Sequence, residues 1–345
     1  MSVTKPEQNL PPGHPPIKQP KVGVLLMNLG TPEATDYWSM RRYLKEFLSD
    51  SRVIEVNRIL WWFVLNVIIL SFRPTKSGHA YEKIWNKTLN ESPLKTFTRN
   101  QTDKLRSALN NTKLVIDWAM RYGNPPVADR MAKLQSAGCD RILLFPLYPQ
   151  YSAATTATAL DKSYDALKTM RWQPAIRTVP PYFDHPEYIS AIATSMQNHL
   201  ALLKWKPDRI LIAFHGLPRE YLDKGDPYHC HCQKTARLLR EKLGYSKDFA
   251  QIVFQSRFGR AEWLKPYAQE TVENLASEGV KNVVIISPGF ASDCVETLEE
   301  LAIGLHETFH EKGGANFSVV PCLNDSPEAI RLFAQLAHEE LKGWA

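Results

Sequence analysis

The chain has 345 residues, of which 44% are hydrophobic and 23% are charged, a balance typical of a globular protein with about two domains. Its formal net charge of +6 permits contact with an anionic membrane surface or an acidic ligand, but no dense basic tract predicts nucleic-acid binding. The five cysteines are scattered, which argues against a disulfide framework and favours a reducing cytoplasm.

The first twenty residues are rich in proline and differ from a targeting segment. They lack the apolar core of a signal peptide and the Arg-rich amphipathic pattern of a transit peptide. We therefore expect residues 1–20 to form a disordered N-terminal lead.

Short apolar runs rich in β-branched residues alternate with amphipathic stretches along the rest of the chain. This alternation predicts a parallel α/β fold, and the continuous apolar character of the runs is typical of strands buried on both faces. The predicted strands are Val22–Leu29, Leu114–Met120, Ile142–Leu147, Ala175–Val179, Ile210–Phe214, Ile252–Gln255, Val283–Ser287 and Phe317–Val320.

Between the first two strands lies the most apolar stretch of the chain, "RILWWFVLNVIILSF", from Arg58 to Phe72. A membrane-spanning helix needs about 20 predominantly apolar residues, so this run is too short to span a bilayer. A buried helix explains part of it, because Leu60, Val64, Val67 and Ile68 fall at helical spacing. It does not explain the nearly complete absence of a polar face, which indicates a ligand groove or a membrane contact.

The second group of four strands echoes the first. The first and fifth strands end in "LMNLGTP" and "IAFHGLP", the second and sixth in "MRYG" and "SRFG", and the third and seventh in "FPLYPQYS" and "ISPGFASD". The matches follow the strand ends in the same order, which predicts two similar halves. Because ligands of open α/β sheets bind beyond the carboxyl ends of the strands, the echoed loops should hold the site.

The echo also shows where the halves differ. His215 replaces Leu29 after the strand, and Glu296 replaces Ala154 after the loop, so the second half gains two titratable groups. His215 could instead be a histidine that hydrogen-bonds to local backbone.

Glu296 has an alternative interpretation as well. "SDCVETLEEL" resembles a capping box, with Asp293 as the N-cap and Glu296 at the third helical position. However, Glu296 and Glu300 have the spacing i, i+4, and like charges at this spacing are unfavourable unless a cation neutralises them. An imidazole with carboxylates suits iron, cobalt or zinc.

Five motifs in order carry a resemblance to a known family: "VLLMNLGTPE", "FPLYPQYS", "FHGLPREYLDKGDPY", "FQSRFGRAEWLKP" and "SPGFASDCVETLEE". From about Lys21 onward the chain is similar to the ferrochelatases, which insert Fe²⁺ into protoporphyrin IX to give protohaem in the last step of haem biosynthesis. The resemblance implies that His215 and Glu296 are catalytic. Their chemistry leaves open whether His215 binds the metal or accepts a pyrrole proton.

The resemblance also implies the remaining site residues. The metal would meet His215, Glu296 and Glu300, and the acidic row stops there because the next position is Gly304. Aromatic side chains would pack against the porphyrin ring, and an arginine would pair with a propionate. Leu29 has no donor atom for a metal, so it could only pack against the ring. The expected porphyrin contacts are Leu29, Arg121, Tyr148, Trp263, Phe290 and Asp293.

The expected fold is therefore a chelatase-like pair of Rossmann-like α/β domains, each with a four-stranded parallel sheet flanked by helices. We expect the lead at 1–20, an N-terminal domain at 21–178, a C-terminal domain at 179–324 and a C-terminal helix at 325–345. In ferrochelatases the segment matching residues 58–72 forms a lip over the porphyrin. Here the expected lip residues are Trp61, Trp62, Leu65 and Ile69, and we expect a cytoplasmic protein attached peripherally to the inner face of an anionic membrane.

Cofactor expectations follow from the cysteines. The sequence has no cysteine after Cys322, so we expect no iron-sulfur cluster, and Fe²⁺ enters as a substrate. In "HCHC", His229 to Cys232, adjacent residues cannot all face one ion, so a bound metal there is not expected. The alternatives to a ferrochelatase are a non-catalytic porphyrin- or haem-binding protein and a related chelatase that uses coproporphyrin or cobalt.

Overall fold

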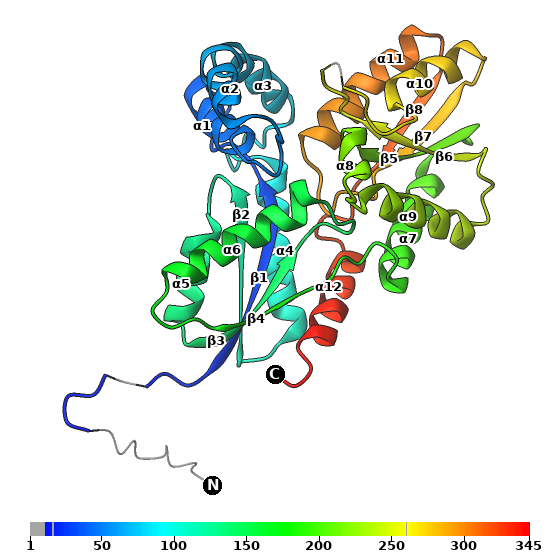
Figure 1. Ribbon diagram of the computed structural model, residues 1–345. Helices are drawn as coiled ribbons and strands as arrows, with labels where there is room; N and C mark the ends of the chain where they lie inside the picture. The colour runs from blue at the N-terminus through cyan, green and yellow to red at the C-terminus, as the bar shows by residue number, and fades with distance from the viewer. Residues whose placement is uncertain (1–10, 16, 260) are drawn as a thin grey trace.

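The computed structural model describes residues 11–15, 17–259 and 261–345, and they form two α/β domains (Figure 1). The sheets have the strand orders β2-β1-β3-β4 and β6-β5-β7-β8, with all neighbours parallel. The second order is the first with four added to each number, so the predicted duplication is confirmed. Of the expected lead, residues 1–10 and 16 lie outside the described residues, and the others contain no helix or strand.

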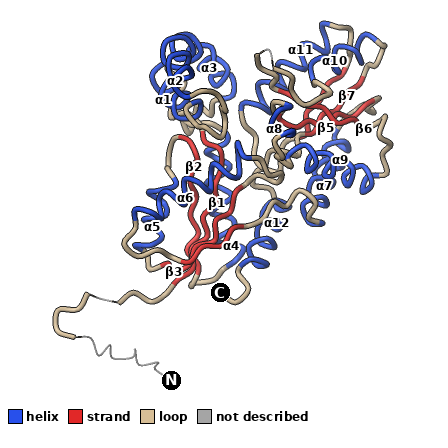
Figure 2. The backbone as a smooth tube through the Cα atoms, viewed as in Figure 1, coloured by secondary structure: helices blue, strands red, loops and turns tan. Residues whose placement is uncertain are grey.

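The N-terminal domain begins with the central strand of its sheet (Figure 2). Its elements are β1 (Lys21–Gly30), α1 (Tyr37–Leu48), α2 (Arg58–Phe63), η1 (Val64–Ile69), α3 (Leu70–Ile84), α4 (Pro93–Leu109), β2 (Leu114–Tyr122), α5 (Val127–Ser136), β3 (Cys139–Pro146), η2 (Ala153–Ala157), α6 (Thr158–Thr169) and β4 (Ala175–Thr178).

The C-terminal domain repeats this plan and ends with a helix that returns to the first domain. Its elements are α7 (Pro186–Leu202), β5 (Arg209–His215), α8 (Arg219–Asp223), α9 (Tyr228–Leu243), β6 (Ala250–Gln255), α10 (Ala268–Ser277), β7 (Asn282–Ile286), η3 (Glu296–Leu305), α11 (His306–Glu311), β8 (Asn316–Val320) and α12 (Pro327–Glu340).

The eight predicted strands are confirmed, but two of them are less buried than expected. The inner strands β1, β3, β5 and β7 are almost continuously buried, as expected for strands covered on both faces. In contrast, β4 and β8 are mostly half-exposed. They are edge strands, but so are the mostly buried β2 and β6, so edge position alone does not explain the exposure of β4 and β8.

One hydrophobic core runs through both domains. It includes Val24 and Phe145 from the first sheet and Phe214 and Phe254 from the second. The C-terminal helix α12 packs against α4 and α7 and so contacts both domains (Figure 1). Helix α12 lies within the expected C-terminal segment 325–345 and covers the boundary between the domains.

Buried polar contacts also join the domains. The side chain of Gln101 on α4 donates to Ser292 Oγ at 2.9 Å and to the Asn324 carbonyl at 2.7 Å. On another part of the boundary, the Asp226 carboxylate accepts from Ser152 Oγ at 3.0 Å and from the Ala153 amide at 2.8 Å. Because such buried polar groups are costly to leave unpaired, these contacts fix the relative position of the domains.

The π-helices η2 and η3 occupy equivalent places after β3 and β7. The sequence echo pairs Ala154 with Glu296, and the structure places these residues in the first turns of η2 and η3. π-Helical turns are rare and frequently lie at functional sites. Both halves thus contain the irregular helix, but only the second half has a carboxylate on it.

The lip lies in α2, η1 and the start of α3, which follow one another without a break. Its helix begins at Asn57, whose side chain accepts from the amides of Ile59 and Leu60. The buried residues are Leu65 and Leu70, and Trp61 and Ile69 pack partly against the same cluster. The expected buried set at Leu60, Val64, Val67 and Ile68 is therefore wrong.

The lip face that points away from this cluster is broadly exposed. Leu65 is only 2% exposed, so it belongs to the core and its assignment to the lip surface is corrected. The exposed lip face consists of Ile59, Leu60, Trp62, Phe63, Val67, Ile68 and Phe72, each more than half exposed. Such a continuous apolar surface is uncommon on a protein that contacts only water.

The continuous helix from Arg58 to Ile84 has 27 residues, which by length and composition alone is enough to cross a membrane. The estimate that the segment is too short considered only residues 58–72. The second half of the helix is not uniformly apolar, because it exposes Lys76, Glu82 and Lys83. On its other side, Pro74, Gly78 and Tyr81 are buried against the protein.

Candidate active site

His215 is the last residue of β5, at the carboxyl end of the second sheet. Its ring Nδ1 lies 2.6 Å from the carbonyl oxygen of Gly216. A carbonyl can only accept, so this contact requires the proton on Nδ1 and leaves the lone pair on Nε2. The hydrogen bond to local backbone that was the alternative interpretation therefore exists, and it also prepares Nε2 to bind a proton or a metal.

Trp263 lies against the backbone next to His215. A Cβ atom on Gly216 would lie 2.6 Å from the Gln255 carbonyl oxygen and 3.1 Å from Cε3 of the Trp263 ring, so only glycine fits. Gly30 is equally constrained in the first half, with φ of 114° and a Cβ position 1.8 Å from the Tyr122 carbonyl oxygen. The structure thus brings the expected aromatic Trp263 beside His215.

Glu300 is held by the residue that follows β6. The Ser256 amide and hydroxyl donate to its two carboxylate oxygens, each at 2.6 Å. Ser256 has φ of 64°, a left-handed conformation that a non-glycine residue adopts only when its surroundings impose it. This backbone strain directs both donors of Ser256 towards the same carboxylate.

Electrostatic coupling links Glu300 to both predicted catalytic residues. Burial raises the pKa of Glu300, and the negative charge of Glu296 raises it further, whereas hydrogen bonds from Ser256 and the charge of His215 lower it. The net direction is upward. Glu300 is therefore a stronger base than an exposed glutamate, and a positive charge nearby would stabilise its ionised form.

The three expected metal ligands do not form a ready-made metal centre. Among the described residues, no three His, Cys, Asp or Glu side chains are grouped closely enough to hold an ion together. The assignment of His215, Glu296 and Glu300 as metal ligands therefore stays a prediction.

The capping box that was the alternative interpretation of Glu296 is not formed. Asp293 is buried, and its carboxylate accepts from Thr297 Oγ1 at 2.9 Å, the Cys322 amide at 3.2 Å and the Asn324 side chain. The Asp293 amide donates to Asn324 Oδ1 at 2.8 Å. Asp293 therefore fixes the loop before η3, which does not support its assignment as a porphyrin contact, and Glu296 is free of the capping role.

Two tyrosines of the N-terminal domain that the sequence analysis missed lie near the Glu296 carboxylate. Burial, the neighbouring Tyr81 and the charge of Glu296 raise the pKa of Tyr43. Burial and Glu296 likewise raise the pKa of Tyr81. Tyr43 lies in α1, and its hydroxyl donates to the Gly30 carbonyl oxygen at 3.2 Å. The site is therefore composed of residues from both domains.

Arg121 does not have the free guanidinium that the sequence suggested. It forms a buried ion pair with Asp50, and its Nε donates to Thr158 Oγ1 at 2.6 Å. Burial would raise the pKa of Asp50, but hydrogen bonds, led by the one from Thr158, and the charge of Arg121 lower it overall. This pairing gives Arg121 a structural role, and its assignment as a porphyrin contact stays a prediction.

The other expected ring contacts have less distinct surroundings. Tyr148 is half-buried beside the Arg121 region, and its hydroxyl has no hydrogen-bond partner within the described residues. Leu29 packs at the edge of a cluster that also contains Val295, the residue before Glu296. Phe290 is half-buried after β7. Leu29 thus lies near η3, and the expected ring contacts of Leu29, Tyr148 and Phe290 remain predictions.

Arg73 is a cation that the sequence analysis missed. It is half-buried on α3, burial lowers its pKa, and no carboxylate pairs with it in the part of the chain that the structure describes. Its guanidinium carbon lies 5.1 Å from the ring centroid of Phe258, in the loop between Ser256 and Trp263. An unpaired, partly desolvated arginine at this position is suited to bind an anion.

The side chains of the "HCHC" motif point to different surroundings. Cys232 is buried in the shared core and Cys230 is exposed. The His231 ring stacks on Phe183 with centroids 3.6 Å apart, and its Nδ1 accepts from the Tyr151 amide at 3.2 Å. This arrangement is that of a domain contact, and the expectation of no metal here stays a prediction.

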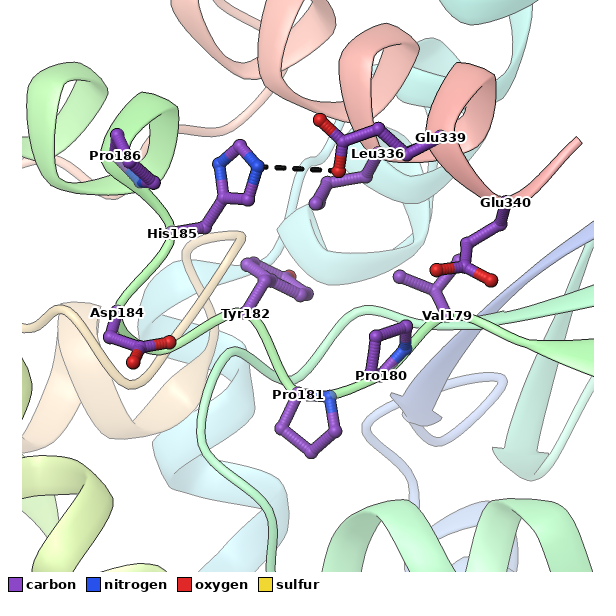
Figure 3. Close-up of a pocket in the computed structure, with 10 residues that line it drawn as sticks. All are labelled: Val179, Pro180, Pro181, Tyr182, Asp184, His185, Pro186, Leu336, Glu339 and Glu340. Atoms are coloured by element: carbon purple, nitrogen blue, oxygen red, sulfur yellow. Dashed lines mark ion pairs between the residues drawn. The ribbon is translucent and has the colours of Figure 1, made fainter. Parts of the chain in front are cut away.

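Two surface pockets lie elsewhere. One, of about 320 Å³, lies between residues 179–186 and α12, where His185 pairs with Glu339 at 3.4 Å (Figure 3). None of the expected site residues lines it. The other, of about 390 Å³, is lined by Asp50 and Arg121 among others. Because Arg121 is paired there, neither pocket is the centre of the proposed chemistry.

Comparisons with known proteins show the family of the chain. The ferrochelatase family model matches residues 21–341. The chain is 59% identical to a ferrochelatase of Rhizobium meliloti (strain 1021), over 96% of this chain and 98% of that protein. It is 57% identical to a ferrochelatase of Allorhizobium ampelinum, over 97% of this chain and 98% of that protein.

Solved structures confirm the fold at lower sequence similarity. SirB from Bacillus subtilis with Fe³⁺ aligns with a TM-score of 0.56 at 12% identity, over 94% of this chain and 98% of that chain. The sirohydrochlorin chelatase SirB from Bacillus subtilis subspecies spizizenii in complex with cobalt gives 0.54 at 10% identity, over 94% and 97%. The duplicated sheets, the site at their carboxyl ends and the relatives along nearly the whole chain together show that this protein belongs to the ferrochelatase family.

Proposed function

We infer that the protein inserts Fe²⁺ into protoporphyrin IX to give protohaem, with His215 as the group that accepts a pyrrole proton. The hydrogen bond from Nδ1 to the Gly216 carbonyl supports this role most directly, because it leaves Nε2 as the basic atom. A free porphyrin carries two N–H protons in its ring, and both have to leave for the metal to bind. A positioned imidazole is an effective acceptor near neutral pH.

Glu296 and Glu300 complete this proposal as the carboxylates that receive charge. As His215 gains a proton, or as Fe²⁺ approaches, the positive charge stabilises the ionised form of the neighbouring Glu300. Glu300 has a raised pKa and can in turn take up a proton from the site. Fe²⁺ is a substrate in this scheme, and we propose that no iron-sulfur cluster takes part.

An anaerobic assay tests the activity directly. Fe²⁺ with protoporphyrin IX should give protohaem, seen as the loss of porphyrin fluorescence and the appearance of haem absorbance. Coproporphyrin and Co²⁺ are tested in parallel, and we expect lower kcat/KM for both. A protein that binds protoporphyrin without consuming it would instead be a porphyrin-binding protein.

We propose that Arg73 pairs with a porphyrin propionate. Arg73→Gln should raise the KM for porphyrin about tenfold, the loss of one charge-assisted hydrogen-bonding group, with kcat little changed. Lys76→Gln removes an exposed cation one turn away and serves as the matched control. Equal KM values for the two variants and the wild type would show that Arg73 does not contact the substrate.

We further propose that the protein is cytoplasmic and attaches peripherally to an anionic membrane through the exposed lip face. This face has an apolar surface and cationic neighbours such as Arg58 and Lys76, a combination typical of interfacial helices. Its opposite side packs through Leu65 and Leu70 on the N-terminal domain. A spanning helix would have to give up these contacts and bury Lys76 and Lys83, so interfacial attachment is favoured.

Replacing exposed lip residues should release the protein from membranes without unfolding it. Trp62→Ser with Ile68→Ser should weaken binding to anionic liposomes about 100-fold, because each buried apolar side chain contributes about 1.5–3 kcal/mol. Sedimentation with liposomes measures this loss, and the melting temperature should stay within about 2 °C. Unchanged sedimentation of the double variant would exclude the lip as the attachment site.

A buried lip residue provides the control. Leu65→Ser should leave the exposed lip face intact but destabilise the fold by about 2–4 kcal/mol, through a cavity and an unpaired hydroxyl. Ile69 is unsuitable for the surface test, since it packs partly against the core cluster.

A further inference from the structure

Two histidines on α11 have their ring nitrogens close together. His306 and His310 are four residues apart on the helix, and their Nε2 atoms are 3.2 Å from each other. Residues four apart lie on the same face of an α-helix, so both rings project to one side. His306 directly follows Leu305, the last residue of η3, and α11 lies at the periphery of the C-terminal domain (Figure 1).

This separation matches two nitrogens bound to one ion. Zinc binds histidine nitrogen at about 2.0–2.1 Å, so two ligands at a tetrahedral angle lie about 3.3 Å apart. The observed 3.2 Å is that of a hydrogen bond between the two rings, and because it is close to this separation, an ion can replace the shared proton. Imidazole pairs suit zinc, copper, iron and nickel in the divalent state.

The surroundings keep the pair available for binding. His310 is exposed and His306 is half-buried, with its ring edge-on to Phe317 at a centroid distance of 5.9 Å. Burial and the neighbouring His310 lower the pKa of His306, which favours the neutral ring that metal binding requires. Of the described residues, no further His, Cys, Asp or Glu completes a three-ligand group here, so water would fill the other positions.

We propose that His306 and His310 form a surface site for a divalent transition-metal ion, separate from the site of iron insertion. The five residues between Glu300 and His306, Leu301 to Leu305, contain no side chain that ligates a metal. The two sites are therefore not joined by a row of ligands along the helix. The pair can bind an ion on its own.

The sequence here, "HETFH", also matches the pattern of helical zinc peptidases, in which the glutamate acts as a base. The hydrogen bond and charge of Glu299 raise the pKa of Lys83, and the charge of Glu307 adds to this, so Glu307 lies towards α3. A third ligand is missing among the described residues. The site is therefore a binding site without peptidase chemistry.

An ion held at positions i and i+4 would stabilise the first turn of α11. This turn is where the π-helical hydrogen-bonding pattern of η3 changes to that of an α-helix. Binding to the folded state alone raises its stability by mass action, so saturating Zn²⁺ should raise the melting temperature by about 2–5 °C. The effect should not depend on porphyrin.

Calorimetric titration of the untagged, full-length protein with Zn²⁺, in the absence of porphyrin, tests the proposal. His306→Asn with His310→Asn should bind one equivalent fewer than the wild type and lose the Zn²⁺-dependent rise in melting temperature. His79→Asn removes an exposed histidine on α3 and should retain both. Any Zn²⁺ that binds at His215 and Glu296 is bound equally by the wild type and the double variant, so it does not contribute to the difference between them.

The single variant His310→Asn guards against misfolding, since His310 is exposed. It should melt at the wild-type temperature in EDTA and bind the surface Zn²⁺ about 10-fold more weakly or worse, because one imidazole remains. The same stoichiometry, affinity and thermal response in the wild type and both variants would overturn the proposal.

Discussion

Replacement of His215 by Ala should lower kcat for Fe²⁺ insertion by about 10²–10⁴-fold, the contribution expected of a positioned general base. Porphyrin binding should change less than about threefold, or about 0.7 kcal/mol, because the apolar and aromatic surroundings remain. Initial rates by haem absorbance and porphyrin affinity by fluorescence titration measure the two quantities separately. The combination of lost turnover and retained binding is specific to a residue that acts on the reaction.

Two controls separate a chemical role from a structural one. Added imidazole should restore part of the activity of His215→Ala, because a free base can enter the space left by the ring. His199→Ala removes a half-buried histidine that contacts Ser318 at 2.8 Å, and it should leave kcat within about threefold. Normal turnover of His215→Ala would exclude the proposed mechanism.

The sequence predicted the strands and their duplication because these depend on local patterns. Each strand is a continuous apolar run, and the turns after β1 and β5 require Gly30 and Gly216 for steric reasons that recur in both halves. The low burial of β4 and β8 was not predictable in the same way. A run of apolar residues does not show how completely the rest of the folded chain covers its strand.

Side-chain partners distant in sequence were the main source of error. Arg121 is paired with Asp50, 71 residues away, and Asp293 with Asn324, 31 residues away. A motif indicates that such a residue belongs to a site, but the partner decides whether its charge is available. The assignment of Leu65 to the lip surface was wrong for a related reason. A segment that is apolar on all sides does not show which side packs against the protein.

The missed residues have surroundings that the sequence does not show. Tyr43 and Tyr81 are indistinguishable from core tyrosines until the structure places them beside Glu296. Arg73 looks like an ordinary exposed cation. Ser256 was within a quoted motif, and only its left-handed backbone and its two contacts with Glu300 show its importance.

Glu296→Gln should lower kcat about 100-fold or more while the fold is retained. The amide has nearly the shape of the carboxylate but carries no charge, so it can neither escort Fe²⁺ nor take up a proton. The structure shows that the Glu296 side chain caps no helix, since Asp293 and its partners fix the start of η3. The melting temperature should therefore stay within about 2 °C of the wild type or rise, because a charge near two buried tyrosines is removed.

Glu299→Gln is the matched control for Glu296→Gln. Glu299 lies on the same helix, but its carboxylate pairs with Lys83 at 2.9 Å on the side facing α3. Exposed pairs of this kind contribute about 0–1 kcal/mol to stability, so the melting temperature of this variant should stay within about 2 °C of the wild type. Its activity should stay within about threefold of the wild type. If Glu296→Gln lost stability while retaining turnover, or if both variants lost activity equally, the carboxylate of Glu296 would have no special role in metal insertion. A selective loss at Glu296 would separate the reacting carboxylate from its neighbour three residues along the same helix.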